Sequence, residues 1–205
     1  TITVDDVLDV IQDEAEEDIM RLGGVRVDDF YTDAIETGRS RFSWLFLNLV
    51  TAIVASIVIG FFEGALEQVV MLAILMPIVA SMGGNAGTQS MTVAVRALAT
   101  KELTGANSLR MIGKETLVGV YNGFLFACLI GLVAWYWSNS LSIGLVMAVA
   151  MAITLVIAAL AGILVPLVIE RSGIDPAIAS SVLLTTITDV VAFSVFLGLA
   201  AWFLL

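Results

Sequence analysis

An acidic residue lies in the middle of the last apolar stretch of the chain, in the segment SSVLLTTITDVVAFSVF. A carboxylate at the centre of a membrane helix costs several kcal/mol, so Asp189 is by default a functional residue. Hydroxyl side chains precede it at helical spacing and are expected on the same helix face. They are Ser181, Thr185 and Thr188. The alternative is a structural aspartate that is hydrogen-bonded to these hydroxyls.

A second polar segment, PIVASMGGNAGTQSMT at residues 77–92, interrupts an earlier apolar stretch. Pro77 removes one backbone hydrogen bond, and the three glycines lower helix stability locally. Such a segment is tolerated at membrane depth where it packs inside protein or lines water, which predicts a pore or binding segment. The alternative is that its small residues only let two helices approach closely. The expected polar stripe consists of Ser81, Asn85, Thr88, Gln89 and Thr92.

These two segments offer oxygen ligands, so the sequence predicts a pathway for a hard cation. The chain has no histidine and a single cysteine, Cys128, which excludes a Cys- or His-ligated metal site. No Lys or Arg lies in the core of an apolar stretch to neutralise Asp189. Mg²⁺ is usually held by one or two carboxylates while it keeps several waters, and a symmetric dimer would bring two copies of Asp189 to one axis. These residues favour a divalent ion without separating Mg²⁺ from Ca²⁺ or Mn²⁺.

Five apolar stretches must position these residues. The chain of 205 residues is 60% hydrophobic, and each stretch exceeds the roughly 20 residues that cross a bilayer. We therefore expect an all-α membrane protein with five transmembrane helices. The fourth stretch is almost featureless, so we expect it to face lipid or to serve as packing support. Glu115, in the third stretch, is expected at the membrane interface. The predicted spans are 42–62, 69–97, 111–137, 141–169 and 176–205.

The basic residues predict the orientation of the chain. If the N-terminus is cytoplasmic, all of them lie on the inner side, and the outer loops near residues 63–67 and 138–140 carry none, as the positive-inside rule requires. We therefore expect a multi-pass protein of the plasma (inner) membrane with its C-terminus outside. The basic residues are Arg21, Arg26, Arg39, Arg41, Arg96, Lys101, Arg110, Lys114 and Arg171.

The N-terminal segment carries most of the acidic residues. Spacings of about three or four predict an acidic helix stripe of Asp6, Asp9, Asp13, Glu14, Glu17 and Asp18. Cytoplasmic divalent cations could bridge this stripe to Asp175, at the inner start of the fifth span, and lock the pore. The alternative is a solvated helix face. Removing these acids without changing the cation dependence of gating would contradict the bridging hypothesis.

The segments PIVASMGGNAGTQS, RALAT and TTITDVVAF resemble the MgtE family of magnesium channels. The N-terminal segment TITVDDVLDVIQDEAEEDIMRLGGV is similar to the end of that family's second CBS domain and its continuation. The resemblance covers essentially the whole chain, and we expect the sequence to be part of a longer protein. It implies that residues 1–23 are a C-terminal remnant of a cytoplasmic CBS domain, 24–42 an amphipathic connecting (plug) helix, and 43–205 a five-helix transmembrane pore domain.

The resemblance also implies a homodimer with five helices per subunit and a pore on the two-fold axis, lined by the second and fifth helices. In this arrangement Asp189 would hold hydrated Mg²⁺, surrounded by oxygens from or near Asn85, Ser81, Thr185 and Ser181. The regulatory Mg²⁺ sites of the family use cytoplasmic acids. Matching places are occupied here by Asp6, Asp9, Glu14, Glu17, Asp18 and Asp175.

We therefore expect a magnesium channel that mediates Mg²⁺ influx and is gated by cytoplasmic Mg²⁺ in the full-length protein. One alternative is a divalent cation secondary carrier or exchanger on the same scaffold, and another is a non-transporting membrane sensor or assembly protein. The expected partners are a second copy of the chain, membrane lipid and divalent cations. Catalysis is not expected because the sequence has no nucleophile–base pair or cofactor motif, and without a basic cluster nucleic-acid binding is not expected either.

Overall fold

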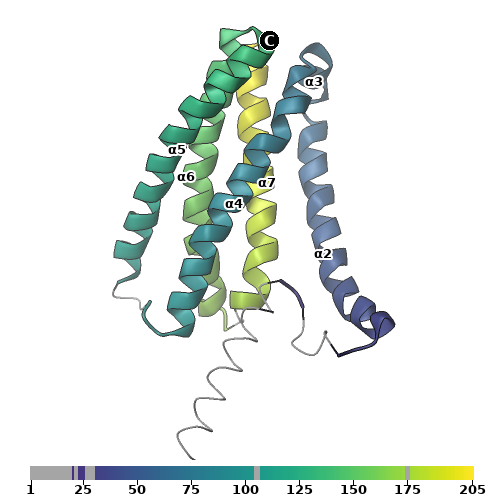
Figure 1. The fold of residues 1–205 in the computed structure, drawn as a ribbon, viewed down its shortest axis with the longest axis vertical. Coiled ribbons are helices and arrows are strands. Elements are labelled where there is room, and N and C mark those ends of the chain that lie inside the picture. The colour runs from purple at the N-terminus through teal and green to yellow at the C-terminus, as the bar shows by residue number, and fades with distance from the viewer. Residues whose placement is uncertain (1–19, 21–22, 26–30, 104–106, 174–175) are drawn as a thin grey trace, which may run out of the picture.

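The computed structural model describes residues 20, 23–25, 31–103, 107–173 and 176–205. In these residues all regular secondary structure is helical, as the apolar stretches predict. Five helices are long and apolar enough to cross a membrane, and a short helix, α3, connects the first two (Figure 1). The helices are α2 (Ala34–Gly60), α3 (Glu63–Gln68), α4 (Met71–Ala99), α5 (Ser108–Ser138), α6 (Leu141–Arg171) and α7 (Pro176–Phe203).

The predicted spans and the observed helices agree except at the first helix. The ends of α4, α5, α6 and α7 lie within a few residues of the predicted ends. Helix α2 begins at Ala34, well before the apolar stretch that was predicted to start at residue 42. Residues 34–42 of the expected connecting segment are therefore continuous with the first span. Apolar sequence marks only the part of a helix that crosses the hydrocarbon, so it misses a helix that continues beyond the membrane.

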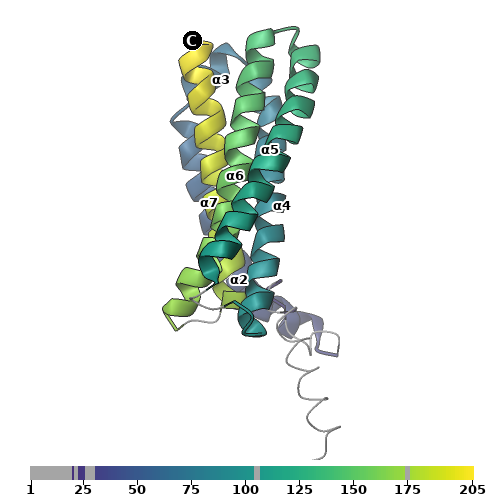
Figure 2. The ribbon, with the colours of Figure 1, turned by 90° about the vertical axis from the view of Figure 1, so that its left-hand side faces the viewer.

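Helix α6 is the centre of the bundle. It packs against α4, α5 and α7, and Figures 1 and 2 both place it between α5 and α7. Its small residues allow close approach: a Cβ added to Gly144 would lie 2.8 Å from the backbone oxygen of Gly131 on α5. The expectation of packing support is confirmed for this helix, and one side of it keeps exposed apolar side chains such as Leu145 and Val149. The buried core around it includes Leu72, Leu75, Met147, Met151 and Phe196.

Helix α2 lies at the edge of the bundle. Its main contact is with α7, and Ala55 is its one buried residue in the part of the chain that is described. Many of its exposed side chains are large and apolar, among them Leu45, Phe46 and Ile57, as expected for a helix that borders lipid. The C-terminus lies at the same end of the bundle as α3 and the α5–α6 turn (Figure 1), because five spans carry the chain to the opposite side.

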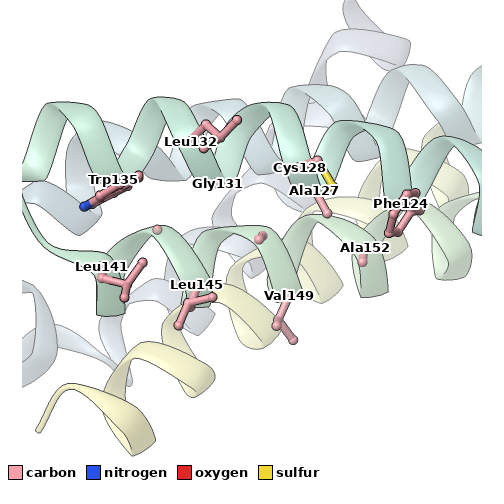
Figure 3. Close-up of a pocket in the computed structure, with 12 residues that line it drawn as sticks. Phe124, Ala127, Cys128, Gly131, Leu132, Trp135, Leu141, Leu145, Val149 and Ala152 are labelled. Atoms are coloured by element: carbon pink, nitrogen blue, oxygen red, sulfur yellow. The ribbon is translucent and has the colours of Figure 1, made fainter.

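An apolar groove of about 480 Å³ runs between α5 and α6 on the outside of the bundle (Figure 3). Its lining carries no charged side chain among the described residues, and Cys128 contributes a thiol. A desolvated cation would find no charge-bearing ligand there. Its lining includes Phe124, Leu132, Trp135, Leu141, Leu145 and Val149.

Candidate functional site

Helix α4 has two faces of different character. Gly83 and Gly87 are buried, whereas the polar stripe predicted from the sequence is exposed on the surface of the single chain. The helix continues through Pro77 without a break, which keeps both faces in one helical register. The exposed stripe comprises Ser81, Asn85, Thr88, Gln89 and Thr92.

The buried glycines let α4 approach α6 and α7 closely. A Cβ added to Gly83 would lie 2.8 Å from the Thr154 side chain of α6, and one added to Gly87 would lie 3.1 Å from the Leu184 side chain of α7. The interpretation of small residues as a packing device therefore holds for these two positions. It does not account for Asn85, which lies between them on the opposite, exposed face.

On α7 the predicted polar face is confirmed at three positions and wrong at one. Thr185 is exposed, and Ser181 and Asp189 are partly exposed. Thr188 is only 1% exposed, so it does not share their surface. At 100° per residue, position 189 lies 40° from 185 whereas 188 lies 60° to the other side, which is enough to turn Thr188 into the bundle.

Asp189 and Asn85 lie at similar depth in the bundle. The Thr188 side chain is 3.9 Å from a Cβ placed on Gly83 and 3.2 Å from one placed on Gly87. Asp189 follows Thr188, and Asn85 lies between the two glycines, so the acid and the amide share one level on neighbouring helices. The structure thereby brings together the two polar segments that the sequence singled out.

The Asp189 carboxyl makes no hydrogen bond within the described residues. The hydroxyls nearest to it in sequence bond to backbone instead: Thr185 Oγ1 donates to the carbonyl of Ser181 at 2.9 Å and Thr188 Oγ1 to that of Thr185 at 3.1 Å. The structural alternative, an aspartate held by hydroxyls of its own helix, therefore has no hydrogen bond to support it in this part of the chain. A partly exposed carboxyl without such bonds remains available to a hydrated cation or to a second copy of the chain.

A complete cation site is not formed by one described chain. Within the described ranges, no cluster of three or more His, Cys, Asp or Glu side chains could hold a metal ion. Asp189 would therefore need water, amide and hydroxyl oxygens, or a symmetry-related carboxylate, to complete a coordination shell. This donor set suits a cation that keeps much of its water.

The structure adds a polar pair that the sequence interpretation missed. Glu115, expected at the interface, is 7% exposed and accepts a 2.8 Å hydrogen bond from Ser90 Oγ on α4. Glu115 shares a spacing of four with Gly119, Gly123 and Ala127, which are buried small residues of α5, so it lies on the face that α5 turns toward the bundle. This periodic stripe is the signal in the sequence that could have placed Glu115 inside the bundle.

The proposed regulatory residues lie outside the described part of the chain. They are Asp6, Asp9, Glu14, Glu17, Asp18 and Asp175.

A family model described as "MgtE: Divalent cation transporter" matches residues 76–199, which include both polar segments. The chain is 35% identical over 204 residues to the magnesium transporter MgtE of Bacillus subtilis, covering 99% of this chain and 45% of that protein. It is 37% identical over 203 residues to the magnesium transporter MgtE of Thermus thermophilus, covering 97% of this chain and 45% of that protein. The chain thus spans about half the length of these curated relatives.

Proposed function

This chain belongs to the MgtE family of divalent cation transporters, and from that premise we propose that it forms the pore of a homodimeric Mg²⁺ channel. The names of its relatives as magnesium transporters support Mg²⁺ as the transported ion. In the proposal, Mg²⁺ enters the cell down its electrochemical gradient and keeps most of its water. Asp189 is the residue that attracts and holds it.

The observation that carries the proposal is a polar surface at membrane depth. Amide and hydroxyl side chains of α4 and the Asp189 carboxyl of α7 are exposed or partly exposed in a single chain. Polar groups in lipid are unfavourable and face protein or a water-filled cavity in membrane proteins. A surface of this kind therefore needs water and a covering partner.

A second copy of the chain is the partner that we propose. Two-fold symmetry is the commonest arrangement of soluble homo-oligomers, and it sets the same surface of each copy against the other. Two α4–α7 surfaces facing each other would enclose a polar path and place two Asp189 carboxylates around one axis. Mg²⁺ dehydrates reluctantly, so carboxylates that bind it through retained waters suit this ion.

Single-channel recording distinguishes the proposed channel from a carrier. With the purified chain in planar bilayers and Mg²⁺ as the permeant cation, we expect discrete openings with unitary conductances too high for a carrier cycle. Empty bilayers and bilayers containing the Asp189→Asn variant serve as controls. Flux in liposomes without discrete openings would instead favour the secondary carrier or exchanger on the same scaffold.

Cysteine cross-linking tests the dimer. In a Cys128→Ser background, needed because Cys128 is exposed, we expect Thr88→Cys to form a covalent dimer with a short bifunctional thiol reagent, read on a denaturing gel. The matched control is Ile53→Cys on α2, which is also exposed at membrane depth but lies outside the proposed interface. Equal cross-linking at both positions, or none at Thr88→Cys, would contradict the proposed surface.

The orientation remains part of the proposal. All basic residues lie at one end of the predicted spans, which supports a cytoplasmic N-terminus and an external C-terminus. Gating by cytoplasmic Mg²⁺ also stays a prediction, because its candidate acids fall outside the described residues.

A further inference from the structure

A buried hydrogen bond joins α4 to α5 on the side of α4 that faces away from the polar stripe. Ser90 is 3% exposed and Glu115 is 7% exposed, and Ser90 Oγ donates to Glu115 Oε2 at 2.8 Å. An acid in the interior of a membrane bundle is unfavourable and is retained where it has a role. The proposed cation path does not use this one.

The same turn of α4 is also held from the α6 side. A Cβ added to Gly162 would overlap the backbone oxygen of Gly87 and lie 2.8 Å from Cβ of Ser90 and 3.0 Å from the backbone nitrogen of Met91. Ser90 therefore lies between the backbone of α6 and the carboxyl of α5. Direct packing between α4 and α5 is otherwise slight compared with the packing of α4 on α6 and α7.

The position of Ser90 matters because its hydrogen bond to Glu115 sets the rotation of α4 about its own axis. Successive side chains are 100° apart on a helix, so a rotation by one position would turn Thr88 and Thr92 away from the surface that they share. The close contacts at Gly83 and Gly87 restrict this rotation, and the directional hydrogen bond from Ser90 adds a further constraint on it. An unpaired buried carboxyl is unfavourable, which makes the aligned state the preferred one.

We propose that Glu115 is a positioning residue, which through its hydrogen bond with Ser90 fixes the rotation of α4 and so aims the polar stripe at the ion path. This inference rests on the proposed function. It assigns Glu115 no contact with the ion. Glu115 supplies a hydrogen-bond acceptor at a fixed position, and its negative charge is not required for this role.

Four variants separate positioning from charge in a liposome Mg²⁺ flux assay. We expect Glu115→Ala and Ser90→Ala each to lower the flux about tenfold, the factor that corresponds to the loss of one buried hydrogen bond. Glu115→Gln keeps an acceptor and is expected to retain flux within about twofold. The double variant Ser90→Ala/Glu115→Ala should be no slower than Glu115→Ala alone, because the two groups act as one unit.

Thiol labelling gives a second readout that simple destabilisation would not reproduce. In the Cys128→Ser background, a water-soluble reagent is expected to label Thr92→Cys and to spare Ala94→Cys, which is fully buried. Adding Ser90→Ala should reduce labelling at 92 and raise it at 94, since α4 rotates. Folded yield and dimer content of each variant are measured in parallel as the control for misfolding.

Loss of flux in Glu115→Gln together with normal flux in Ser90→Ala would overturn the inference and assign an electrostatic role to the acid. Unchanged flux and labelling in Ser90→Ala and Glu115→Ala would overturn it as well. Failure of the proposed function is recognised separately, because in that case the unmodified chain would show no Mg²⁺ flux that depends on Asp189.

Discussion

Replacing Asp189 by asparagine is expected to reduce Mg²⁺ flux by about a hundredfold or more. The substitution keeps the size of the side chain and removes its charge, so the packing of the partly exposed residue is preserved. Interactions of a charged group with hydrogen-bonding partners contribute about 1.5–3 kcal/mol each, and a symmetric dimer loses two such groups. A loss of about 3 kcal/mol corresponds to roughly a hundredfold. Flux is measured in liposomes with a Mg²⁺-sensitive dye.

The matched control for this experiment is Glu67→Gln. It also removes one negative charge, but from the short helix α3, where the side chain is exposed outside the spans. We expect this variant to conduct Mg²⁺ within about twofold of the unmodified chain, because exposed charges are well screened at physiological salt. Flux that survives in Asp189→Asn at the level of this control would refute the cation path and favour a structural role for the acid.

Replacing Gly162 by alanine is expected to produce the largest loss of stability. The added Cβ would meet the backbone of α4 at Gly87 and Met91 and the Cβ of Ser90, none of which is the movable end of a flexible side chain. Overpacking of this kind costs about 1–3 kcal/mol or more. We expect a lower yield of folded protein and a lower midpoint of thermal aggregation in detergent.

Gly113→Ala on α5 is the control for the Gly162 variant. No atom lies within 4 Å of a Cβ added to Gly113, and alanine favours a helix interior over glycine by about 1 kcal/mol. We expect the thermal midpoint of Gly113→Ala to stay equal or to rise slightly. A midpoint for Gly162→Ala as high as that of the control would contradict the close approach of α6 to α4.

The five helices could be predicted because uninterrupted apolar length is a strong signal. The central place of α6 could not, since a helix that is apolar on all sides carries no pattern to tell protein neighbours from lipid. Asp189 and Asn85 could be singled out as candidates because polar groups are rare in the middle of an apolar stretch. Thr188 was misplaced because a stripe from Ser181 to Asp189 is wide enough to cross the edge of a buried face.

The burial of Glu115 against α4 illustrates a different limit of sequence interpretation. Its charge and the neighbouring Lys114 suggested the membrane surface, and that local signal outweighed the periodicity that Glu115 shares with Gly119 and Gly123. The hydroxyl partner, Ser90, lies 25 positions earlier in the chain. No spacing rule within a single helix could reveal that pair, which depends on how α4 and α5 are both placed by α6.

The central position of α6 has a consequence for synthesis of the protein. Helices α4 and α5 hardly pack on each other directly, and the surface that gathers them belongs to a helix that leaves the ribosome after both. Helices α4 and α5, which carry the polar stripe and Glu115, are therefore synthesised before α6 is complete at Arg171. The order in which these helices are synthesised therefore differs from the order in which they can pack together.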